Sequence, residues 1–211
     1  MTALAHTERA QLADLLDASG PDAPTLCGDW TTRDLAAHLV ARDRRPLSLP
    51  GLVVPALGGL TERTRRGLRD SRSYEDLVGV VRQGAPAWSP VGFPPTERAA
   101  NAVEYFVHHE DVRRAKPGWE PRALDDAHQS ALWRRLRSAA SLLVRRADGT
   151  VTLRRADGAQ VSTGRGEPHV VVTGEPAELM LCAFGRQEQA RVEYEGDPTA
   201  VTRLRGAPLG F

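Results

Sequence analysis

The residues of most chemical interest lie in the segment NAVEYFVHHED, residues 101–111. At about 100° per residue on a helix, the side chains of Glu104, His108 and Asp111 fall within about 60° of one another, and Asn101 lies beside them. A carboxylate and an imidazole one helical turn apart can both reach one metal ion. The spacing therefore predicts a divalent metal site of the zinc, nickel or iron type.

A third metal ligand is expected from a separate helix. There, His38 stands between Leu35 and Leu39, which mark the buried stripe of that helix. Three protein ligands leave one coordination position open for water or substrate, which is typical of catalytic rather than structural sites. We therefore predict that His38, Glu104 and His108 bind one divalent metal. Zn²⁺ is favoured, with Ni²⁺ or Fe²⁺ as alternatives.

The neighbours of this set have more than one interpretation. Asp111 could be a fourth ligand, a partner of a metal-binding histidine, or the ion-pair partner of Arg113 or Arg114. We favour the second role and assign Asn101 to the same outer layer. His109 projects to another side of its helix and is expected to be partly solvated.

The loop TLCGDW precedes the helix of the first histidine. Its Cys27 could provide a reactive thiolate near the entrance of the bundle, but a small, partly buried structural cysteine is the favoured interpretation. Trp30 is expected to pack beneath the start of the helix. The arginine clusters at 42–45, 63–66 and 134–137 are interpreted mainly as solvated surfaces, some of which could still bind an anionic substrate.

Hydrophobic periodicity and capping residues predict the helices that must carry these side chains. They are expected over residues 3–18, 32–45, 61–69, 74–84 and 123–141, with the longest helix opening at Thr96 and ending before Pro117. Ser73 is expected to cap the fourth of these, and Gly84 to end it. The Pro/Gly-rich segment 46–60 is expected to form an irregular flap.

Beyond residue 145 the pattern changes to short alternating runs. An Asp157-Gly158 turn between two such runs predicts a β-hairpin. The segments HVVVTG and ARVEYEGD are predicted strands, and EPAELMLCAFGR between them is a predicted helix. We therefore expect a helical bundle over 1–145 and a small α+β domain over 146–211.

Composition limits the possible functions. The chain has 211 residues and a formal net charge of +1, without the basic excess of nucleic-acid-binding domains. Its first residues lack the regions of a signal peptide, and no apolar run approaches the ~18 residues of a membrane span. We expect a cytoplasmic monomer or homodimer that binds small molecules, with no nucleic-acid or membrane partner.

Two segments together, TLCGDWTTRDLAAHLVARD and NAVEYFVHHEDVRRA, resemble the mycothiol-dependent maleylpyruvate isomerase group of the DinB-like metal-binding superfamily. The resemblance implies a DinB-like four-helix bundle with a zinc-type site, whose ligands fall on His38, Glu104 and His108. It also implies a sterol-carrier-like α+β C-terminal domain, to which VVVTGEPAELMLCAFGR is similar. Arg186, at the end of that stretch, is the candidate for the arginine that assists substrate binding and catalysis in the family.

The resemblance further implies a function. A metal-bound thiol cosubstrate, mycothiol, would attack a small electrophile in a transfer or isomerisation reaction. Two alternatives stay open on the sequence: a non-enzymatic, metal-stabilised module that binds a ligand or partner, and a metal-dependent hydrolase that uses the same three ligands.

Overall fold

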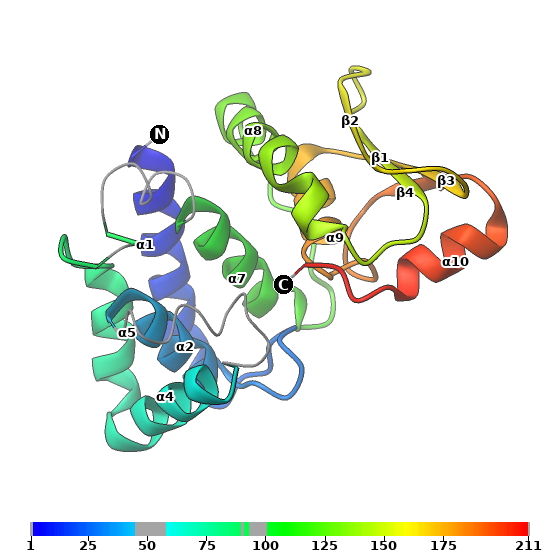
Figure 1. Ribbon diagram of the computed structural model, residues 1–211. Helices are drawn as coiled ribbons and strands as arrows, with labels where there is room; N and C mark the ends of the chain where they lie inside the picture. The colour runs from blue at the N-terminus through cyan, green and yellow to red at the C-terminus, as the bar shows by residue number, and fades with distance from the viewer. Residues whose placement is uncertain (1, 45–57, 90, 93–100, 211) are drawn as a thin grey trace. The chain divides into compact units, whose positions relative to one another are not determined.

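The structure is a computed structural model that describes residues 2–44, 58–89, 91–92 and 101–210 (Figure 1). Thr96 and most of the predicted flap at 46–60 lie outside these residues. The chain divides into two compact units, Met1–Glu120 and Pro121–Phe211. None of the helices in the described ranges combines the length and the hydrophobicity that a membrane span needs.

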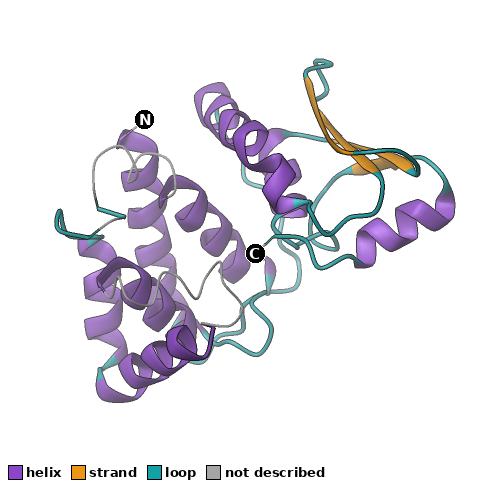
Figure 2. Ribbon diagram, in the orientation of Figure 1, coloured by secondary structure: helices purple, strands orange, loops and turns teal. Residues whose placement is uncertain are grey.

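The first unit is helical (Figure 2). Its described helices are α1 (Thr2–Ser19), α2 (Thr32–Arg44), α4 (Gly58–Ser71), α5 (Tyr74–Gln83) and α7 (Ala102–Arg114). Helix α1 packs against α5 and α7, and α2 packs against α4 and α5. Leucines and alanines spaced by three or four residues form the core, for example Leu12 and Leu16 of α1 and Leu35 and Leu39 of α2, all fully buried.

Local signals explain where two of these helices begin. The Ser73 hydroxyl accepts the Asp76 N–H at the start of α5, and Gly84 ends the helix with φ 78°, as predicted. At the start of α2 the residue inside the helix is the acceptor: the main-chain N–H and the hydroxyl of Thr31 both donate to the carboxylate of Asp34. This arrangement also stabilises the helix start, because an acidic group near a helix N-terminus is favourable.

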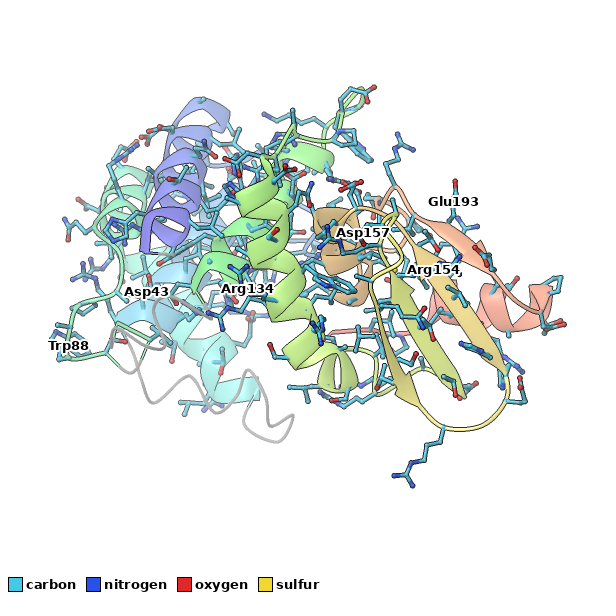
Figure 3. The ribbon with its side chains drawn as sticks, turned by 90° about the horizontal axis from the view of Figure 1, so that it is seen from above. Asp43, Trp88, Arg134, Arg154, Asp157 and Glu193 are labelled. Carbon is cyan, nitrogen blue, oxygen red and sulfur yellow. The ribbon has the colours of Figure 1, made fainter. Side chains whose placement is uncertain are left out.

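The second unit contains a four-stranded sheet of strand order β2-β1-β3-β4. The strands are β1 (Thr150–Arg154), β2 (Gln160–Gly164), β3 (His169–Thr173) and β4 (Glu193–Glu195). Strand β1 pairs antiparallel with β2 through the predicted Asp157-Gly158 hairpin and parallel with β3, and β3 pairs antiparallel with β4. Arg154 and Glu193, both labelled in Figure 3, each align with Thr173, so by the strand register these three residues lie in one row across the sheet.

Three helices complete this unit: α8 (Asp126–Leu143), α9 (Pro176–Ala183) and α10 (Pro198–Gly206). Every residue of α9 is buried, and α8 packs against α9. The predicted α+β character of the C-terminal part is confirmed. The boundary between the two units falls at Glu120–Pro121 rather than near residue 145, so α8 belongs to the second unit, where it packs against α9. Helix α10 was not predicted.

Candidate metal centre

The three predicted ligands converge, although they come from two helices distant in the sequence. His38 Nε2 lies 3.2 Å from Glu104 Oε1, and His108 Nε2 lies 3.3 Å from the same oxygen. The two imidazole rings meet edge to face, with 5.2 Å between their centroids. All three ligand atoms lie within 4.8 Å of one another.

These separations fit a tetrahedral metal site. Two nitrogen or oxygen donors, each about 2.0–2.1 Å from a zinc ion, are about 3.3 Å apart when they subtend a tetrahedral angle. The two nitrogen–oxygen distances of 3.2 and 3.3 Å equal that value within 0.1 Å. Two imidazoles and a carboxylate are also donors that zinc, nickel and iron accept. The residues present therefore fit a divalent metal.

Helix geometry and packing position each donor. Glu104 and His108 are four residues apart on α7, so their side chains stack on one face. His38 stands between two fully buried leucines on α2. The side chains of His38 and His108 are 9% and 11% exposed, whereas that of Glu104 is 23% exposed. Glu104 Oε1, the oxygen that both histidines approach, thus belongs to the most exposed of the three residues.

Asp111 contacts the ring nitrogen of His108 that is not directed at Glu104. Its Oδ2 lies 2.9 Å from His108 Nδ1, and its side chain is fully buried. A carboxylate at this nitrogen favours the tautomer with the proton on Nδ1, which leaves the Nε2 lone pair directed at the ligand set. Of the three roles considered for Asp111, the geometry favours the partner of a metal-binding histidine. Arg113 and Arg114 both pair with the neighbouring acid Glu110.

Arg42 is a buried member of the site that sequence reasoning missed. It was expected to be solvated, yet it is 5% exposed. Its guanidinium contacts Asp43 through Nη1 at 2.9 Å, Asn101 through Nη2 at 2.7 Å and Glu104 through Nε at 3.5 Å. Asn101 therefore contacts Arg42 rather than a histidine, and it supports Glu104 only through that arginine. Three engaged nitrogens leave Arg42 ill suited to binding substrate.

The charges of the site favour an ionised Glu104. Without a metal, burial tends to raise its pKa, but the charge of Arg42 and hydrogen bonds donated by both histidines hold that pKa well below its ordinary value. Burial lowers the pKa of His38, so this ring is held neutral, the form that binds metals. Burial also acts to lower the pKa of His108, but its contacts with Asp111, Cys27 and Glu104 outweigh burial and raise the pKa well above 6.5.

A protein-family model matches the part of the chain that contains the first of the three candidate ligands, His38. Residues 2–70 match the model of the mycothiol maleylpyruvate isomerase N-terminal domain. This match confirms the resemblance predicted from the sequence, over a segment that contains Cys27 and His38 but not Glu104 or His108. No protein in a search of curated proteins matches the chain.

Solved structures extend the comparison to both units. The crystal structure of the mycothiol-dependent maleylpyruvate isomerase shares 16% identity with this chain, at a TM-score of 0.57, and the match covers 92% of this chain and 91% of that one. A histidine-to-alanine mutant of such an isomerase matches at a TM-score of 0.55 with the same identity and coverage. At this identity the comparison establishes the fold: a helical N-terminal domain followed by an α+β domain.

The loop that contains Cys27 and Trp30, within the segment matched by the isomerase-domain model, contacts both His38 and His108. The Cys27 thiol donates to Asp111 Oδ2 at 3.1 Å, and its sulfur lies 3.8 Å from His108 Nδ1. Trp30 lies beside the ring of His38, with 5.2 Å between ring centroids. The expected packing of Trp30 at the helix start thus includes contact with a candidate ligand.

Two other expectations about individual residues need correction. His109 was expected to be partly solvated, but it is 6% exposed, and its Nδ1 lies 3.2 Å from Glu8 on α1. Arg65 was placed on a solvated surface. It is 4% exposed, pairs with Asp34 and lies over the Trp30 ring at 4.8 Å. Each polar group is buried because it has a partner from another segment, which periodicity along one helix cannot reveal.

Arg186 lies in the second unit, shortly after α9. Its Nη1 lies 2.5 Å from the main-chain carbonyl oxygen of Phe184, and its side chain is partly exposed. The isomerase resemblance is what assigns it a role in substrate binding, and that role stays a prediction.

Proposed function

We propose that the protein binds one divalent metal ion through His38, Glu104 and His108 and uses it in a reaction between a small thiol and a small electrophile. The observation that carries the proposal is the convergence of three suitable donor atoms from two helices within 4.8 Å of one another, with both histidine nitrogens 3.2–3.3 Å from Glu104 Oε1. The isomerase-domain match supports mycothiol as the thiol. Thiol transfer, or isomerisation through a thiol adduct, is the proposed reaction class.

The donor set suits thiol chemistry on charge grounds. Both histidines must be neutral to bind a metal, so the three ligands together contribute a single negative charge. A divalent ion there would retain positive charge toward an anionic fourth ligand. When bound, such an ion lowers the pKa of a coordinated thiol and so supplies a nucleophilic sulfur at neutral pH. Zn²⁺ is the favoured ion, with Ni²⁺ or Fe²⁺ as alternatives.

The residues around the ligands would hold the site in shape during the reaction. Asp111 fixes the ring of His108, and Arg42 holds Glu104 ionised and oriented. Because both Asp111 and Glu104 are already engaged, neither is poised to act as a general base for water, which makes hydrolysis the weaker candidate. Arg186 is our candidate for binding a carboxylate of the electrophile.

Metal content and thiol binding test the proposal in sequence. Protein purified without added metal is analysed for bound elements, and the metal-loaded and metal-stripped forms are titrated with mycothiol by calorimetry. We expect about one equivalent of metal and thiol binding that requires it. Failure to retain metal refutes the site. Metal retention without mycothiol binding refutes the thiol reaction and leaves a metal-stabilised ligand- or partner-binding module.

Two single-histidine variants, one at a candidate ligand and one at a control position, test the ligand assignment. His108→Ala should abolish stoichiometric metal binding, whereas His6→Ala, which removes an exposed histidine of α1 in the same unit, should leave it intact. Full retention of metal by His108→Ala would mean that the ligand set has been misassigned.

A further inference from the structure

One oxygen of Asp111 receives two donors. His108 Nδ1 lies 2.9 Å from Asp111 Oδ2, and the Cys27 sulfur lies 3.1 Å from the same atom. Asp111 is fully buried, so its carboxylate depends on protein donors rather than on water. The Cys27 thiol and the His108 imidazole therefore both provide hydrogen bonds to the Asp111 carboxylate, which orients the ring of His108.

The loop around Cys27 is built to hold the thiol there. The main-chain N–H of Leu26 donates to the carbonyl oxygen of Asp111 itself at 3.1 Å. The N–H of Cys27 donates to the Thr25 hydroxyl at 3.1 Å, and that hydroxyl donates to the Trp30 carbonyl oxygen at 2.8 Å. The loop is thus attached to α7 at the residue whose side chain its cysteine contacts.

We propose that Cys27 is a positioning residue for the metal site: its thiol holds the carboxylate of Asp111, and through it the ring of His108. The inference rests on the proposed function, since it presumes that His108 binds the metal. Partners in this outer layer typically change metal affinity by about 10–100-fold when removed. Cys27 acts one step further out, so a loss near the lower end, about 10-fold, is expected.

The same side chains admit a competing role, in which Cys27 is itself a ligand. Cys27, His108 and Asp111 also offer three donor atoms within 4.8 Å of one another, on the opposite nitrogen of the histidine ring. The 2.9 Å separation of His108 Nδ1 and Asp111 Oδ2 is that of a hydrogen bond and is shorter than the roughly 3.3 Å between two such donors around zinc. The geometry therefore favours the hydrogen-bonded, positioning role.

The test compares Co²⁺ binding by the wild type and five variants of the whole chain: Cys27→Ala, Cys27→Ser, Cys182→Ala, Asp111→Ala and the Cys27→Ala/Asp111→Ala double variant. Cys27→Ala should bind Co²⁺ about 10-fold more weakly than the wild type, and Cys27→Ser, which keeps a hydroxyl donor, should recover most of that loss. Cys182→Ala is the control, because it removes the other cysteine, buried in the second unit. In an Asp111→Ala background, Cys27→Ala should cause no further loss, because the thiol acts through that carboxylate.

The Co²⁺ absorption spectrum separates the outcomes. Wild-type protein should lack the intense near-ultraviolet band of a thiolate–cobalt bond; its presence, and its loss in Cys27→Ala, would show that the cysteine is a ligand and overturn the inference. Equal affinity in wild type and Cys27→Ala, no recovery by Cys27→Ser, or a full additional loss in the Asp111→Ala background would also overturn it. If the wild type binds no Co²⁺ at all, it is the proposed function that fails.

Discussion

Replacing Arg42 with methionine is expected to destabilise the metal-free N-terminal unit by about 3–5 kcal/mol. The guanidinium is 5% exposed and contacts Asp43, Asn101 and Glu104. Methionine keeps an unbranched stem but has no donors, so the buried Asp43 and the partly exposed Glu104 lose their counter-charge. The Tyr105 hydroxyl still donates to Asp43 at 2.9 Å. We therefore expect the lower end of the range.

Metal should partly compensate for this substitution. A cation bound beside Glu104 would replace the charge that Arg42 supplied there, but not the charge at Asp43. In the variant the metal should bind more tightly, because relief of the repulsion from Arg42 outweighs the loss of its 3.5 Å contact with Glu104, a carboxylate that the metal itself keeps ionised. A tenfold gain in affinity corresponds to about 1.4 kcal/mol of additional stabilisation by excess metal.

Urea unfolding with chelator and with excess Zn²⁺ measures both effects. Arg82→Met is a suitable control because Arg82 also pairs with two carboxylates, Asp14 and Asp17, but is 43% exposed. Exposed pairs of this kind contribute about 1 kcal/mol or less. If Arg42→Met lost no more stability than Arg82→Met without metal, or if Zn²⁺ stabilised both variants equally, our account of the buried charges would be refuted.

Three further predictions concern the histidines. Asp111→Asn should weaken metal binding by about 10–100-fold, measured by chelator competition; an unchanged affinity would remove its role behind His108. His109→Ala should retain the metal but lower the unfolding free energy, because it leaves Glu8 buried without its imidazole partner; loss of the metal would mean that the wrong histidine was chosen. In metal-free protein the raised pKa of His108 adds stability that is fully present below pH 6.5 and is lost as the pH rises through the folded-state pKa. His108→Gln should abolish that loss in pH-dependent unfolding, and an unchanged pH profile would contradict the assignment.

The convergence of the three candidate ligands could be predicted because their placement follows local rules. Spacing by four on α7 and the apolar neighbours of His38 on α2 are visible in the sequence, and the family resemblance joined the two helices. The Asp157-Gly158 hairpin and the Ser73 cap followed from turn and capping chemistry for the same reason.

Contacts between distant segments could not be predicted in this way. Arg42 lies within a cluster of arginines, and only its contacts with Asn101 and Glu104, about 60 residues further along the chain, show that it is buried. Likewise, the partner of His109 is Glu8, near the other end of the unit. The apolar side of α8 shows that the helix packs on something, but not that its partner is α9. The sequence does contain a signal for α10, since Asp197 followed by Pro198 is a typical helix start, but the prediction did not use it.

The attachment of the Cys27 loop to Asp111 has a consequence for protein engineering. Residues 2–70 form a natural cassette to exchange between homologues, since a single domain signature describes them. Such an exchange would replace the loop while keeping the original α7, and the hydrogen bonds from Leu26 and Cys27 would then meet a helix for which they were not matched. Functional chimeras of this fold should therefore transfer the loop and residues 101–114 together.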